Sequence, residues 1–70
     1  MTTIYLALLN EGVDVWRPVE ATHLSADRYR VEGKIPDHEE WAFAPGTTVR
    51  CEHKMFSSGV ARLTAIEVAS

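Results

Sequence analysis

Cys51 and His53 form the first pair in this chain whose residue types and spacing suggest chemistry. Residues two apart in a strand share a face, so a thiolate and a base would lie within reach of each other. A reactive cysteine also needs an electropositive, partly exposed setting and a third group that orients the base. A free cysteine more often packs as a small apolar residue. We therefore expect a buried Cys51, with His53 at the rim of the fold, and no catalytic residues.

The three histidines, His23, His38 and His53, could form a metal site together with Cys51. No pair among them shows a spacing that recurs in zinc sites. His38 lies in an acidic stretch, where a solvated side chain is expected. The sequence therefore predicts no metal and no cofactor.

The run Asn10-Glu11-Gly12-Val13-Asp14-Val15-Trp16-Arg17-Pro18-Val19 is the best candidate for a recognition surface. Trp and Arg most often anchor contacts, and Pro18 lacks the N–H needed inside a sheet, which favours an edge strand or a loop. A second reading places Trp16 and Trp41 in the two ends of a small core. Arg17 would then only pair with a nearby glutamate at the surface, with Glu20, Glu39 and Glu40 as the candidates. The candidate binding residues are Trp16, Arg17, Pro18, Glu39, Trp41 and Phe43.

Charged residues gather in one acidic loop and along two alternating stretches. The loop could dock a basic partner, although a charge run is often simply solvated. The alternating cations could form a basic face for phosphates, but Glu32 and Glu52 interrupt them, which favours cross-strand pairing instead. The acids are Asp37, Glu39 and Glu40, and the cations are Arg28, Arg30, Lys34, Arg50, Lys54 and Arg62.

Composition restricts the class of protein. Seventy residues suit one domain, spanning 1–70, and a hydrophobic fraction of 46% argues against disorder. The net charge of −3 argues against a nucleic-acid module, which usually carries a basic stripe. A lone cysteine fits a reducing compartment, and the start of the chain does not resemble a signal peptide. The apolar run 4–9 is too short to span a bilayer, so we expect a cytoplasmic protein.

The hydrophobic pattern predicts five short strands. They cover residues 4–9, 15–24 with a bend near Pro18, 28–35 with a bulge or bend at Gly33, 48–54, and 60–68 after a hairpin turn at 57–59. Residues 36–46 form a loop or, alternatively, include a single helical turn that starts at Asp37. The expected fold is all-β, a small five-stranded antiparallel barrel. Its expected core is Leu6, Leu8, Val19, Val31, Val49, Cys51 and Leu63.

The order of strands and turns resembles an SH3-like barrel. The run Phe43-Ala44-Pro45-Gly46-Thr47-Thr48-Val49 resembles the Gly-led strand entry of bacterial members of that fold. The chain is also similar to short bacterial proteins of unknown function that share "NEG-x-DVWRPV". Peptide-binding SH3 domains carry Ala-Leu-Tyr-Asp-Tyr and a Trp pair, whereas this chain has Leu6-Ala7-Leu8-Leu9-Asn10 and no Trp-Trp. The resemblance therefore implies the fold but not the binding of proline-rich peptides.

These observations favour a non-enzymatic protein-binding or assembly module that contacts a protein partner through Trp16, Arg17 and Pro18 and the loop 37–43. A homodimer through an edge strand is one form of such an assembly. A small immunity or antitoxin-like inhibitor is another. The alternative from a different class is a small barrel that binds nucleic acid through its face, which would need a contiguous basic face with exposed aromatic rings. An enzyme that uses Cys51 and His53 is the remaining alternative.

Overall fold

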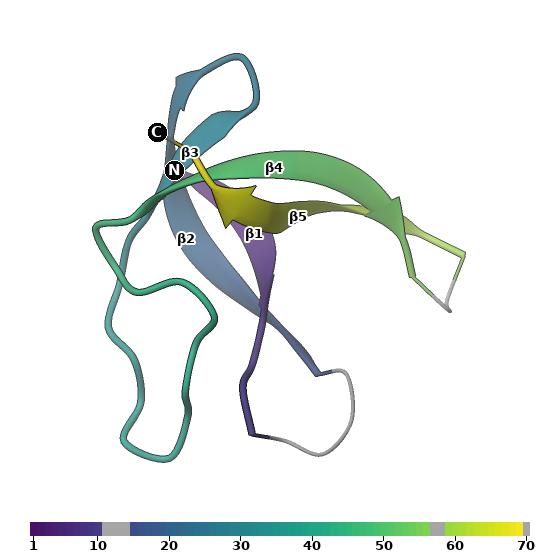
Figure 1. Ribbon diagram of the computed structural model, residues 1–70. Helices are drawn as coiled ribbons and strands as arrows, with labels where there is room; N and C mark the ends of the chain where they lie inside the picture. The colour runs from purple at the N-terminus through teal and green to yellow at the C-terminus, as the bar shows by residue number, and fades with distance from the viewer. Residues whose placement is uncertain (11–14, 57–58, 70) are drawn as a thin grey trace.

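The structure, a computed structural model, describes residues 1–10, 15–56 and 59–69, and within them it contains five β-strands and no helix. The strands hydrogen-bond to one another in chain order and close into a barrel (Figure 1). This confirms the predicted all-β, five-stranded fold and is consistent with a small SH3-like barrel. The strands are β1 (Thr2–Ala7), β2 (Trp16–Ser25), β3 (Arg28–Val31), β4 (Thr48–Met55) and β5 (Ala61–Val68).

The barrel is not purely antiparallel, and that part of the prediction was wrong. β1 to β5 pair antiparallel with each successive neighbour, but β5 closes onto β1 in parallel, with Tyr5 opposite Thr64. The reason is geometric. When five strands alternate in direction, the first and the fifth run the same way, so the closing pair of an odd-numbered barrel must be parallel.

The third strand is shorter than its alternating sequence suggested. β3 ends at Val31, and Gly33 takes a φ of +93°, a left-handed conformation that glycine adopts at little cost. The chain then leaves the sheet, and the N–H of Glu39 donates to the carbonyl of Pro36 over 3.0 Å. Residues 36–39 therefore form a hydrogen-bonded turn rather than the start of a helix. The predicted extension of this strand to Ile35 was wrong.

Pro18 is tolerated inside the continuous strand β2, because its nitrogen, which has no hydrogen to donate, does not face a hydrogen-bonding partner. The carbonyl of Glu20 accepts from the N–H of Glu32, so it points away from β1. Residues two apart in a strand point their backbone groups the same way, and β3 pairs with β2 only from Ala21 onward. The nitrogen of Pro18 thus faces an open edge, which is where proline is tolerated in a sheet.

The core is built mainly from alternate residues of the strands. Leu6, Val31 and Val49 are fully buried, and Val19 and Cys51 are nearly so, as predicted. Leu8 and Leu63 are only partly buried and pack against the core from its edge, so their predicted burial was wrong. Both lie beyond the closed part of the sheet, where fewer strands cover them. The buried apolar cluster comprises Ile4, Leu6, Val19, Ala21, Tyr29, Val31, Trp41, Val49, Cys51 and Ala65.

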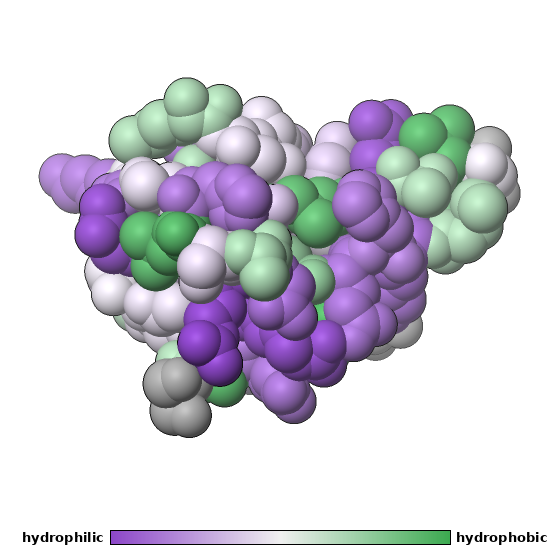
Figure 2. Space-filling model, turned by 90° about the horizontal axis from the view of Figure 1, so that it is seen from above, coloured by the Kyte–Doolittle hydropathy of each residue, from purple (hydrophilic) through white to green (hydrophobic). Residues whose placement is uncertain are grey.

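The β4–β5 hairpin, formed by two strands of eight residues, extends beyond the rest of the barrel on one side (Figure 1). Near its end Met55 and Val60 are exposed, and Figure 2 shows apolar side chains there beside a mostly hydrophilic face. The predicted turn at 57–58 lies outside the described residues, as do residues 11–14. In the described part of the chain, no helix is long and apolar enough to cross a membrane.

Candidate functional site

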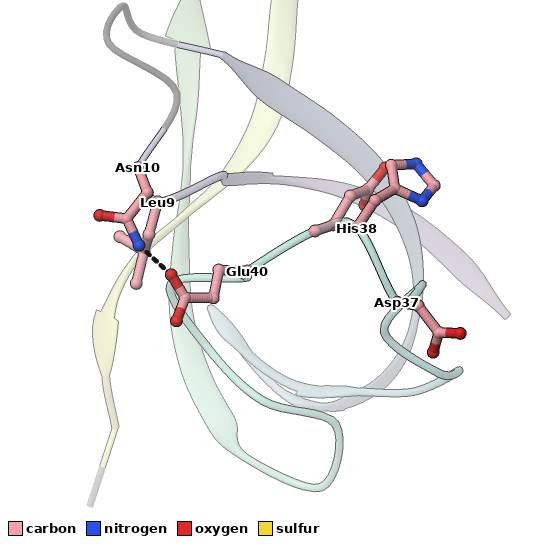
Figure 3. A pocket seen from close by; sticks show the side chains of 6 residues that line it. Leu9, Asn10, Asp37, His38 and Glu40 are labelled. Carbon is pink, nitrogen blue, oxygen red and sulfur yellow. Dashed lines mark hydrogen bonds and ion pairs between the residues drawn. The ribbon is translucent and has the colours of Figure 1, made fainter.

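An open hollow of about 380 Å³ lies between the chain that follows β1 and the loop that follows β3 (Figure 3). The backbone holds the two segments together. The N–H of Leu9 donates to the carbonyl of Glu40 over 2.7 Å, and the N–H of Ala42 donates to the carbonyl of Ala7 over 2.9 Å. This short ladder fixes the loop at the end of the barrel. The lining residues are Leu9, Asn10, Asp37, His38, Glu39 and Glu40.

Asn10 closes one side of the hollow. Its φ of +61° is left-handed, a conformation in which asparagine is enriched among non-glycine residues. The side-chain amide of Asn10 donates a hydrogen bond to the Glu40 carboxylate, the dashed line in Figure 3. An uncharged amide does not neutralise that carboxylate. The exposed Glu40 side chain therefore presents its carboxylate at the rim of the hollow.

Glu39 ties the loop to the barrel. One carboxylate oxygen accepts from the indole Nε1–H of Trp41 over 2.9 Å, and the other lies 3.3 Å from Nη1 of Arg17. The exposed His38 approaches the same oxygen at 3.8 Å. Only 8% of the Glu39 side chain is exposed, so its carboxylate interacts mainly with neighbouring side chains of this protein rather than with solvent. The carboxylates left at the surface of the loop are those of Asp37 and Glu40.

The structure separates the six residues that the sequence singled out. Arg17, Glu39 and Trp41 form one contact network through Glu39, with Trp41 in the core and Arg17 exposed. The Arg17–Glu39 pair was one of the three pairings expected from the sequence. Phe43 is partly buried against the core and is not among the residues that line this hollow.

Trp16 and Pro18 lie on the other face of β2. Residues Val19 and Ala21 point into the core, so even-numbered positions of this strand point outward. Trp16 packs instead against Phe56 from the end of β4, with ring centroids 5.7 Å apart, and Pro18 is exposed. Trp16, Arg17 and Pro18 are therefore adjacent in sequence but do not present one continuous ridge.

Cys51 is buried, with 3% of its surface exposed, and His53 is exposed on the same strand. Burial, and to a lesser extent the Asp27 carboxylate, raises the pKa of the Cys51 thiol to about 11. A protonated, buried thiol is a poor nucleophile at neutral pH. Within the ranges that the structure describes, no three His, Cys, Asp or Glu side chains are grouped so as to hold a metal ion.

The buried thiol predicts a pH dependence of stability. An unfolded cysteine ionises near pH 9.0, whereas the folded thiol holds its proton until about pH 11. The stability gained from protonated Cys51 is thus complete below pH 9 and is lost as the pH rises through 11. Urea denaturation of the wild type and of Cys51→Ala across this range should show a steeper loss for the wild type. Parallel pH profiles would contradict the burial of a thiol at this position.

Two cations of β3 and β4, Arg30 and Arg50, are paired with carboxylates. Arg50 lies opposite Glu67 in the ladder and contacts both Glu67, at 3.0 Å, and Glu52. These carboxylates raise the pKa of Arg50. Glu32 accepts from Thr22 over 2.7 Å and from Arg30 over 2.8 Å, and these hydrogen bonds lower the pKa of Glu32. Cross-strand charge pairing is confirmed for Arg50 and Glu67.

Comparisons with family models, with curated proteins and with solved structures found no match for this chain. The similarity to bacterial proteins that carry "NEG-x-DVWRPV" therefore stays an expectation from the sequence. What the protein does has to be argued from its own geometry.

Sequence reasoning missed Leu9 as a lining residue, because the run 4–9 was predicted to be a strand. Asn10 was part of the candidate recognition run, but the sequence did not place it beside the acidic loop. The pairing of Leu9 with Glu40 brings both residues to that loop. Nothing in the local sequence indicates which distant loop lies next to these residues.

Proposed function

We propose that this protein is a non-enzymatic protein-binding module whose contact surface is the acidic hollow described above. The partner side chain that fits best is a lysine or arginine on an exposed segment of another protein. The loop 37–40 is part of the contact surface that the sequence predicted. The proposed contact surface is smaller than that prediction, because it is restricted to the residues that line the hollow. A cytoplasmic setting is part of the proposal, supported by the lone reduced cysteine.

The proposal rests on a difference among the three acidic residues of the loop: one is held by contacts within the protein and two are exposed. Glu39 is held by Arg17 and Trp41, which fixes the shape of the loop. Asp37 and Glu40 remain exposed at the hollow and carry the charge that a partner would meet.

The apolar part of the hollow fits the same partner. Leu9 is 46% exposed and lines the same hollow as Asp37 and Glu40. A long basic side chain can lay its methylene stem on Leu9 while its charged head reaches Asp37 or Glu40. Pairing through the open edge of β2 is less favourable, because Pro18 removes a backbone donor from that edge. A protein partner at the hollow is therefore a better fit than a second copy at this edge.

The double variant Asp37→Asn/Glu40→Gln tests the proposal. Two rim ion pairs of about 0.2–1 kcal/mol each correspond to binding that is roughly two- to thirtyfold weaker. We expect this loss in capture from a lysate of the native host, followed by measurement of the affinity for the captured partner. Association should slow most, and its dependence on salt should flatten, because rim charges act mainly on the rate of encounter.

The matched control is Glu20→Gln/Glu67→Gln, which removes the same charge from two exposed positions outside the hollow. This variant should retain most of the affinity. If both double variants lose affinity equally, only the net charge matters, and the hollow is not the contact surface.

A further inference from the structure

Five side chains from β1, from the start of β2 and from the β4–β5 hairpin pack against one another on the outer face of the barrel. Phe56 packs edge-on against Tyr5 at 5.6 Å and lies tilted against Trp16 at 5.7 Å. Lys54 Nζ lies 4.6 Å from the centroid of the Trp16 ring, and the Arg62 guanidinium lies 5.5 Å from that of Tyr5. We call Tyr5, Trp16, Lys54, Phe56 and Arg62 the aromatic corner.

The rings of the aromatic corner are accessible. Tyr5, Trp16 and Phe56 are partly buried, and none of them belongs to the buried apolar cluster, which uses Tyr29 and Trp41. The corner therefore leaves aromatic surface in contact with solvent.

The two cations of the aromatic corner differ from three of the other arginines in having no carboxylate partner. Lys54 and Arg62 lie opposite each other in the ladder, and both are exposed. Within the described residues neither forms an ion pair, whereas Arg17, Arg30 and Arg50 each have a carboxylate partner. Two unneutralised cations thus share one face with three aromatic rings.

We propose that the aromatic corner binds single-stranded nucleic acid. Unstacked bases would pack on the exposed ring surfaces, and the phosphates would contact Lys54 and Arg62. Aromatic platforms flanked by cations recognise single strands because every base offers a π-face and every nucleotide a negative charge. A duplex hides its base faces, so it satisfies only the charges. The net charge of −3 opposes binding elsewhere on the surface, which confines the strand to this corner.

This proposal does not depend on the acidic hollow. Arg17 and Glu39 belong to that hollow's contact network, and neither takes part in the aromatic corner. Removing Asp37 and Glu40 should therefore leave binding of a single strand in place. The two proposals can fail separately.

Fluorescence anisotropy of a labelled oligothymidylate of about ten nucleotides tests the proposal, since such a strand matches the reach of a small barrel. Two phosphate contacts predict that log K falls with log salt with a slope of about −1.4. Trp16 should report stacking through quenched fluorescence, whereas the buried Trp41 should contribute a constant background. A duplex of the same length should bind more weakly.

Arg62→Gln and Arg28→Gln form a matched pair, because both remove one exposed cation that has no ion-pair partner among the described residues. Arg62→Gln and Lys54→Gln should each reduce the magnitude of the salt slope by about 0.7, whereas Arg28→Gln should leave it unchanged. Trp16→Leu should weaken binding roughly five- to hundredfold, since that is the range for one stacked base.

The melting temperature of each variant separates loss of binding from loss of fold. If Trp16→Leu fails to fold, the exposed Lys54→Gln and Arg62→Gln variants still decide the question. The proposal is overturned if the wild type does not bind the single strand, if it binds the duplex equally well, or if Arg28→Gln and Arg62→Gln have equal effects.

Discussion

Replacing Trp41 by alanine is expected to lower the free energy of unfolding by about 3–5 kcal/mol. The ring is 9% exposed and lies in the apolar cluster, so its removal leaves a large cavity. The variant also removes the indole donor of Glu39, whose side chain is only 8% exposed. A small domain has about 5–15 kcal/mol of stability in total, so this loss is a large fraction of it. Urea denaturation followed by far-UV circular dichroism measures it.

Trp41→Phe separates the two parts of this effect. Phenylalanine keeps much of the buried ring but cannot donate to Glu39, and the loss of one hydrogen bond costs about 0.5–1.5 kcal/mol. The phenylalanine variant should therefore be clearly more stable than the alanine variant. If Trp41→Ala unfolds at the same urea concentration as the wild type, the loop that carries Trp41 is not packed on the barrel as described.

Replacing Leu6 by alanine is the second large change, with an expected loss of about 2–5 kcal/mol. Leu6 is fully buried within β1, which pairs with β2 on one side and with β5 on the other. Leu8 lies on the same face of the chain but beyond the end of β1, and it is only partly buried. Its site can relax toward solvent, so Leu8→Ala should cost less than Leu6→Ala.

Thermal melting of the two variants side by side provides the check, because both make the same chemical change. A larger loss from Leu8→Ala would place the centre of the core nearer the acidic hollow than the structure does. Equal and small losses would mean that β1 is not a central strand of the barrel.

The fold was predictable because the alternation of apolar and polar residues is a local signal. It indicated all five strands and the burial of Val31, Val49 and Cys51. It failed where local and tertiary preferences differ. The alternation continues to Ile35, yet the backbone turns at Gly33, so side-chain pattern alone extended β3 too far. The parallel pairing of β5 with β1 follows from the number of strands. It could have been derived from the five strands that the sequence predicted.

The candidate sites were less predictable because they depend on which distant segments meet. Arg17 had three plausible glutamate partners in the sequence, and the structure selects Glu39. The aromatic corner could not be seen at all, since Tyr5 and Phe56 are far apart in sequence. Their contact depends on how the β4–β5 hairpin is placed beside β1 when the barrel closes. Adjacent residues such as Trp16 and Arg17 were wrongly grouped because neighbours in a strand point to opposite faces.

The most direct test of the acidic hollow is a titration of isotope-labelled protein with a short arginine- and lysine-rich peptide, followed through backbone amide chemical shifts. We expect saturable shifts at Leu9, Asn10 and residues 37–40, and we expect Asp37→Asn/Glu40→Gln to weaken them while Glu20→Gln/Glu67→Gln does not. Saturable shifts confined to another surface, or equal affinities for the two double variants, would contradict the hollow as the place where this protein meets its partner.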